Sequence, residues 1–164
     1  MKPQKSAPKA VQRSYLITPH LEKSLNRLLA SEAVLYFKTK KAHWLASGPN
    51  FKEVHEMLDA QATFILASID EFAERVTMLG GLPSGGLSEF LSSSMMKDFE
   101  SSERKISRFL PALLSDHATL ILAMRDAIEL ATSENDPGTA DLLTRLVQEH
   151  EKAAWFLRET VSQD

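Results

Sequence analysis

Residues 51–79 read FKEVHEMLDAQATFILASIDEFAERVTML, and this stretch decides the fold. Its apolar residues recur at intervals of three and four, so on a helix that turns about 100° per residue they fall within one arc. These residues are Val54, Leu58, Ile65, Ile69, Phe72 and Val76. The pattern predicts a long amphipathic helix, bounded by Gly48-Pro49 on one side and Gly80-Gly81 on the other.

Three further segments between glycine- and proline-containing breaks show the same helical periodicity. Thr18-Pro19 and Asp136-Pro137 are typical of an N-cap followed by a first helical residue. Pro111 is expected in the first turn of a helix, where its missing N–H does little harm. The expected long helices span residues 19–46, 51–79, 107–133 and 137–161, with a short helix at 87–93. These elements predict an all-α, ferritin-like four-helix bundle with a short helix in the long crossover between helices two and three.

The composition is that of an ordinary globular domain. The 164 residues include 19 Lys plus Arg and 22 Asp plus Glu, for a formal net charge of −3, and no cysteine. Without cysteine, disulfides, thiolate metal sites and cysteine nucleophiles are excluded. No apolar run approaches the roughly 20 residues of a membrane helix. The basic N-terminus lacks the apolar segment of a secretory signal, so a cytoplasmic location and no membrane partner are expected.

The N-terminal residues differ in charge from the rest of the chain. Residues 1–18 are expected to form a flexible basic tail, and residues 19–164 the helical domain. Four positive charges and no acid lie in this tail, so removing them from the net charge of −3 leaves −7 on the domain. The basic residues are Lys2, Lys5, Lys9 and Arg13. Two interpretations stay open, a solubilising disordered end and a segment that makes non-specific, salt-dependent contacts with phosphates.

The helix at 51–79 also carries a pattern of metal-ligand residue types. His55 and Asp59 form one i,i+4 pair, and Asp70 and Glu74 form another. Each pair shares a helix face, and all four residues fall in an arc about 100° wide beside the apolar arc. One such pair is usually a solvated polar stripe. Two pairs in one arc, with His43 at the end of the preceding helix, favour a set of metal ligands.

The spacing prevents one copy of this helix from using both pairs at a single metal. Asp59 and Asp70 are separated by about 16 Å along a helix, whereas metal–ligand bonds are about 2 Å long. A second, antiparallel copy would place His55 and Asp59 of one chain opposite Asp70 and Glu74 of the other. Small residues between the pairs permit the close approach of two helices. The prediction is an isologous dimer with two identical sites, and the origin of His43 in either chain stays open.

The donor set indicates which metals fit. Two imidazoles and three carboxylates, without sulfur, suit iron(II), manganese or zinc. Three carboxylates favour a hard ion that can be oxidised to iron(III). No histidine in the chain has a glutamate three residues before it. A Glu-x-x-His di-iron site inside the bundle core is therefore not expected.

Five segments of the sequence closely resemble the Dps family, the mini-ferritins described as DNA-binding proteins of starved bacterial cells. The family's ferroxidase motif, His-x11-His-x3-Asp-x10-Asp-x3-Glu, is matched without a gap by the five candidate ligands. The segments are KAHW at 41–44, GPNF at 48–51, HEMLD at 55–59, DEFAER at 70–75 and LGG at 79–81. Residues 139–143 and 155–157 fit the family more loosely, so the resemblance extends over about residues 21–160.

The resemblance implies a homo-oligomer, a hollow dodecamer built from two-fold dimers with intersubunit iron sites. It implies a ferroxidase, an oxidoreductase that oxidises iron(II) preferentially with hydrogen peroxide. Ferric mineral would be stored in the shell, and DNA would be protected from oxidative damage. Zinc or manganese could substitute for iron. The implied catalytic metal ligands are His43, His55, Asp59, Asp70 and Glu74.

Other polar and aromatic residues carry weaker signals. Trp44 adjoins the ligand set and either intercepts oxidising equivalents, as the resemblance suggests, or packs at an interface. Three acids near the start of the last helix either line an iron-conducting pore, again by resemblance, or cap that helix. These acids are Glu134, Asp136 and Asp141. His117 and His150 are expected at solvent or at an interface, and Trp155 in the core.

Two other functions compete with iron oxidation. Some Dps-like proteins gather DNA through a lysine-rich tail and others do not bind it. Many tails on one oligomer would act together. The first alternative is therefore a non-specific DNA-compacting protein of the nucleoid, with a weak or non-iron metal site. The second is a plain helical interaction module in which the ligand stripe is accidental.

Overall fold

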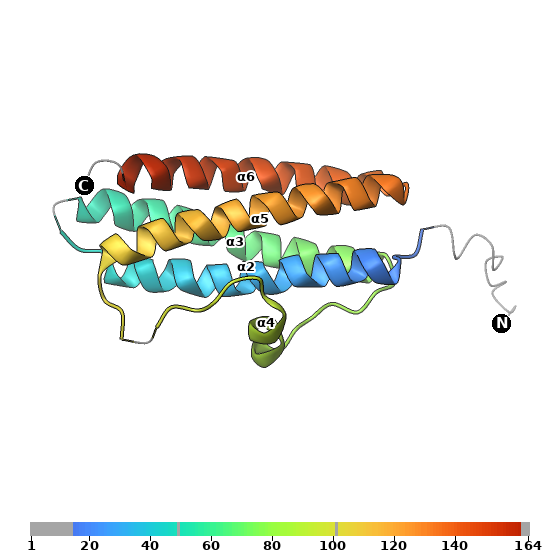
Figure 1. Cartoon of the computed structure of the whole chain (residues 1–164), viewed down its shortest axis with the longest axis horizontal. Helices are drawn as coiled ribbons and strands as arrows, with labels where there is room; N and C mark the ends of the chain where they lie inside the picture. Colours follow the sequence, from blue (N-terminus) through green and yellow to red (C-terminus); the bar gives the residue numbers. More distant parts are fainter. Residues whose placement is uncertain (1–14, 49, 101, 162–164) are drawn as a thin grey trace, which may run out of the picture.

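The computed structural model describes residues 15–48, 50–100 and 102–161, and these form a four-helix bundle (Figure 1). The part of the chain that it describes contains no strand. The helices are α2 (Pro19–Leu45), α3 (Phe51–Met78), α4 (Leu87–Ser93), α5 (Ile106–Ser133) and α6 (Pro137–Val161). The prediction of an all-α bundle with a short helix in its crossover is confirmed. The basic residues of the tail lie outside the described residues.

The helices pair as two hairpins joined by the crossover. α2 packs against α3, and α5 packs against α6. The crossover between α3 and α5 runs beside α2 along the bundle and contains α4, so α3 and α5 run parallel (Figure 1). The short link between α2 and α3 places the end of α2 and the start of α3 at one end of the bundle. Among the described residues, no helix combines the length and apolar character of a membrane span.

Pro111 departs from its expected place. α5 begins at Ile106, so Pro111 lies inside the helix beyond its first turn. Its ring removes the N–H that would bond to the carbonyl of Ser107. Both residues are exposed, so water can satisfy that carbonyl.

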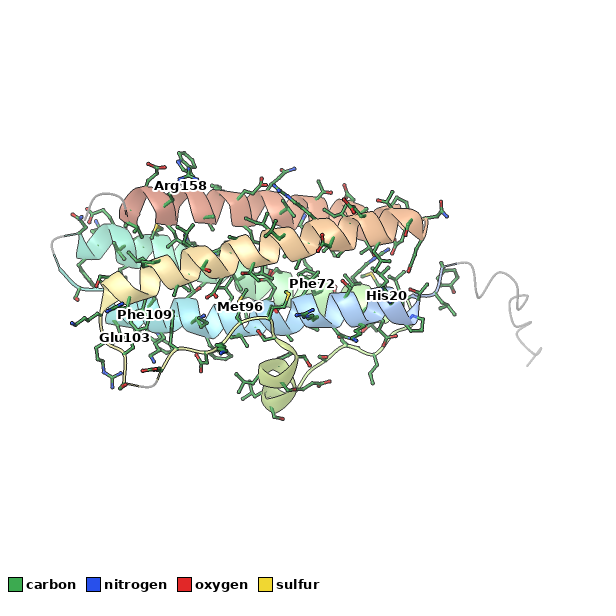
Figure 2. All side chains as sticks on the ribbon, in the orientation of Figure 1. His20, Phe72, Met96, Glu103, Phe109 and Arg158 are labelled. Atoms are coloured by element: carbon green, nitrogen blue, oxygen red, sulfur yellow. The ribbon has the colours of Figure 1, made fainter. Side chains whose placement is uncertain are left out.

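The apolar arcs of the four long helices meet in one core. On α3 the residues Leu58, Ile65, Phe72 and Val76 are all fully buried, as the periodicity predicts. In Figure 2 Phe72 and Phe109 lie within the bundle.

Trp155 is half exposed, so its predicted place in the core is wrong. Ala153 and Leu157 take the buried positions of this part of α6. Trp155 is two residues from each of them, which turns it about 200° away around the helix.

A buried lysine anchors the crossover to the bundle. Lys38 of α2 is only 4% exposed, and its Nζ lies 2.5 Å from Oδ2 of Asp116 on α5. The same ammonium donates a hydrogen bond of 2.9 Å to the carbonyl of Lys97 and lies 4.6 Å from the centroid of the Phe99 ring. One side chain therefore ties together two long helices and the crossover.

Asp136 caps the start of α6 and ties it to α3. Its Oδ1 accepts a hydrogen bond of 3.0 Å from the backbone N–H of Thr139 and lies 2.5 Å from Nη2 of Arg75. Its Oδ2 accepts a hydrogen bond from the Thr139 hydroxyl. Partial burial acts to raise the pKa of Asp136, but the hydrogen bonds from Thr139 and the Arg75 cation outweigh it and hold this pKa below its usual value.

Replacing Asp136 with alanine is expected to lower the free energy of unfolding by about 1–2 kcal/mol, because the cap of α6 is lost. A carboxylate whose pKa is lowered by folding stabilises the fold above its unfolded pKa, and this contribution disappears as the pH falls through the folded value. The difference between wild type and D136A in urea denaturation should therefore shrink in acid. The exposed Asp141 is the control, and equal losses in D136A and D141A would contradict the capping role.

Candidate metal centre

Two histidines meet where the α2–α3 hairpin closes. His43 lies in the last turn of α2 and His55 near the start of α3, with ring centroids 3.7 Å apart and planes inclined by 27°. The Nδ1 of His43 lies 2.9 Å from the carbonyl of His55, and the Nδ1 of His55 lies 3.1 Å from the carbonyl of His43. A carbonyl only accepts hydrogen bonds, so each Nδ1 carries the hydrogen. In the neutral imidazole, Nε2 then keeps a lone pair that can bind a metal. Metal-binding histidines in proteins are oriented by hydrogen bonds of this kind from the other ring nitrogen.

A carboxylate completes this group. Asp59 lies one turn after His55 on α3, and its Oδ1 is 3.8 Å from Nε2 of His43. Lys40 donates a hydrogen bond of 2.9 Å to the same oxygen. This hydrogen bond and the charge of Lys40, helped by the two histidines, lower the pKa of Asp59. The carboxyl group is therefore ionised at neutral pH. A cation that binds to this carboxylate would compete with the Lys40 ammonium for the same oxygen.

The other two candidate ligands lie farther along α3. Asp70 and Glu74 are exposed, and neither forms a hydrogen bond or ion pair with another described residue. Within one chain, the described residues contain no group of three ligand side chains arranged to hold a metal ion. The structure stacks His43 on His55 and places His43 beside Asp59, and it leaves the second carboxylate pair apart.

The surface of α3 between the two ligand groups is open. Ala60, Thr63, Leu66 and Ala67 are all exposed on it. Small side chains allow two helices to approach closely, and an exposed leucine gains from being covered. This face has the character that an antiparallel contact with a second α3 requires.

Trp44 is 66% exposed and follows His43 directly in the chain. Its exposure fits either an interface contact or a position beside the metal centre. Both interpretations stay predictions.

The structure assigns internal contacts to two of the three acids proposed for a pore. Glu134 accepts a hydrogen bond of 2.7 Å from the hydroxyl of Thr18. Asp136 caps α6 and pairs with Arg75. Asp141 is exposed. The capping alternative is therefore confirmed for Asp136, and Asp141 stays the pore candidate without such a contact.

The prediction that His117 and His150 face solvent or an interface is wrong, because both are 0% exposed in the bundle core. The signal was present in the helical spacing. His117 lies between Leu113 and Leu120, and His150 lies between Leu146 and Ala153, all of which are buried. A histidine at such a position points inward with its apolar neighbours.

Comparison with known proteins gives consistent results. Residues 22–164 match the ferritin-like domain family. A DNA protection during starvation protein of Agrobacterium fabrum is 37% identical over 139 residues, which cover 85% of this chain and 86% of that protein. The solved structure of Dps from Thermosynechococcus elongatus is 36% identical, with a TM-score of 0.83 over 87% of this chain and 90% of that chain.

A Dps protein from Vibrio cholerae has a TM-score of 0.83 and is 28% identical, and the comparison covers 97% of this chain and 99% of that one. That protein is a member of a broad superfamily of ferritin-like diiron-carboxylate proteins.

Proposed function

This chain belongs to the Dps family of ferritin-like proteins, and from that premise we propose that it is a ferroxidase that oxidises and stores iron. The observation that carries the proposal is the histidine pair at the α2–α3 hairpin. In both rings Nδ1 bonds to a carbonyl, which leaves Nε2 for a metal, and Nε2 of His43 lies 3.8 Å from the ionised carboxylate of Asp59. Neutral imidazole and carboxylate are ligands that suit ferrous iron.

The proposed centre forms between two copies of the chain. His43, His55 and Asp59 of one protomer would face Asp70 and Glu74 of its two-fold partner, and six such dimers would build the dodecameric shell. The position of Asp70 and Glu74, exposed farther along α3 and apart from the two histidines, supports this division. Zinc or manganese would compete for the same donors.

The donor set suits the oxidation step. The two histidines supply neutral nitrogen donors, and the three carboxylates stabilise the additional positive charge of iron(III). We propose hydrogen peroxide as the preferred oxidant. Two ferrous ions would each lose one electron, the O–O bond would break, and two protons would complete two waters. Because both electrons reach one peroxide, no hydroxyl radical is released, and the ferric product would be stored as mineral inside the shell.

The test is to load the protein with iron(II) without oxygen and then add hydrogen peroxide or air, following ferric absorbance. We expect fast oxidation with peroxide, slow oxidation in air, and loss of both in Asp59→Ala. Asp126→Ala, which removes an exposed carboxylate of α5, is the control and should retain the rate. Equal or faster oxidation in air would favour ordinary ferritin chemistry. If the protein accelerates neither reaction, the ferroxidase proposal is wrong.

Protection of DNA would follow from removing the reactants that generate radicals. The similarity to the DNA protection during starvation protein of Agrobacterium fabrum supports this role. Direct DNA binding through Lys2, Lys5, Lys9 and Arg13 stays a prediction, as does the cytoplasmic, nucleoid-associated location that it implies.

A further inference from the structure

Three ionisable side chains form a connected chain in the bundle core, away from the proposed iron centre. Glu32 of α2, His117 of α5 and His150 of α6 are each 0% exposed. The Nε2 of His150 lies 2.8 Å from Oε1 of Glu32, and its Nδ1 lies 2.8 Å from Nδ1 of His117. His150 thus connects the other two, and the chain links three of the four long helices.

The surroundings of this chain are largely apolar. On the α3 side, the Phe64 ring packs edge-on against His150 at 5.2 Å between centroids and lies 6.3 Å from that of His117. The buried polar residues of α3 are Gln61 and Ser68, and both are uncharged. On α2 and α5 the buried Lys38 and the partly buried Asp116 pair with each other.

The contact between the two histidines limits how many hydrogens can lie between their Nδ1 atoms. A carboxylate accepts hydrogen bonds, so the Nε2 of His150 carries a hydrogen toward Glu32. The two Nδ1 atoms at 2.8 Å can share only one hydrogen, because a second would point two N–H groups at each other. The far ends offer no relief, since Nε2 of His117 and Oε2 of Glu32 have no hydrogen-bond partner among the described residues.

We propose that Glu32, His150 and His117 form an acid-sensitive latch that holds α2, α5 and α6 together while one hydrogen lies between the two histidines, and that a second proton opens it. When the shared hydrogen lies on Nδ1 of His150, that ring is an imidazolium facing Glu32, and a second proton on His117 would place two imidazolium groups in contact inside the buried core. A buried, unpaired charge is strongly unfavourable. The latch is independent of the metal centre and of the proposed oxidation chemistry.

The direction of the pH effect follows from His117. Burial, and then the charge of His150, lower the pKa of His117 well below its ordinary value. In the unfolded chain this histidine binds a proton near pH 6.5, whereas in the folded chain it does not. Its contribution to stability is therefore complete above about pH 6.5 and decreases as the pH falls, by up to about tenfold in the folding equilibrium constant per pH unit.

The first experiment needs no substitution. Hydrogen–deuterium exchange at the imidazole Cε1 of each histidine is followed by mass spectrometry from pH 8 to 4.5 on the assembled wild-type protein, alongside its helical circular dichroism. The exposed His20 serves as the reference histidine in contact with water. His117 should exchange slowly and begin to titrate only where the helical signal is lost. If His117 titrates with His20 in the folded protein, the latch does not exist.

The second experiment compares wild type with His117→Gln and the matched control His20→Gln. The glutamine has no charge at any pH, and its amide can still bond to His150. Urea midpoints are measured at equal protein concentration from pH 7.5 to 5. Below pH 6.5 we expect the folding equilibrium constants of wild type and H20Q to decrease up to about tenfold more per pH unit than that of H117Q. Parallel curves for all three proteins would overturn the proposal, and the exchange measurement decides it if H117Q does not fold.

Discussion

Producing Asp59→Ala and Glu74→Ala chains together is expected to restore about a quarter of the wild-type iron oxidation that each variant alone loses. Each substitution removes a proposed metal ligand, so each homogeneous protein should lose at least about 100-fold, more than is typical when a residue that only hydrogen-bonds to a ligand is changed. In a mixed two-fold dimer, one site contains both substitutions and the other contains neither. Random pairing makes half of the dimers mixed, and half of their sites are intact.

This complementation separates a shared site from one built within a single chain. Co-production of Asp70→Ala with Glu74→Ala is the matched control, because both residues belong to the same half of the site. Every dimer of that pair lacks a ligand in both sites, so no activity should return. The readout is the initial rate of ferric absorbance after peroxide is added to ferrous-loaded protein. Rescue in both pairs, or in neither, would contradict the intersubunit site.

Lys38→Met is expected to destabilise the fold by about 3–5 kcal/mol, the usual result of removing one partner from a buried ion pair. The substitution leaves Asp116 without its partner, removes the hydrogen bond to the Lys97 carbonyl and ends the contact with the Phe99 ring. The methionine is of similar length, so the cavity term is small. Urea denaturation of the two proteins at equal concentration measures the difference.

The pH dependence gives this prediction a second readout. Burial raises the pKa of Asp116, with Lys38 opposing the shift. A carboxyl group whose pKa is raised by folding costs stability when ionised, and the cost decreases as the pH falls through its folded value. Without Lys38 this pKa should rise further, so the loss in K38M should shrink on acidification.

The double variant Lys38→Met with Asp116→Leu serves as the control for charge, because it removes both ions and should recover most of the stability. A loss in K38M that is unchanged by pH and by the second substitution would show that packing, not the ion pair, determines the effect.

Much of the candidate site could be predicted because helix geometry is periodic. The intervals between His55, Asp59, Asp70 and Glu74 place them in one arc, and α3 shows Asp59, Asp70 and Glu74 exposed beside a buried apolar arc. Asp59 and Asp70 are separated by about 16 Å along the helix. One copy of the helix therefore cannot bring both residues to the same metal ion.

Two features of the site depend on contacts between helices. The carbonyl that orients each histidine belongs to the other helix of the hairpin, so the free Nε2 atoms follow only from how α2 and α3 meet. Lys40 reaches Asp59 from the preceding helix in the same way. Neither contact has a periodic signature along the chain.

The sequence by itself determined the four long helices, the crossover with its short helix, and the ligand stripe, because each follows from local spacing and from the breakers between segments. Which of the inward-facing polar residues contact one another depends on the tertiary structure. His117 and His150 are 33 residues apart, and Glu32 is 118 residues from His150. These contacts form only because the bundle brings α2, α5 and α6 together. The periodicity within one helix does not encode contacts between helices.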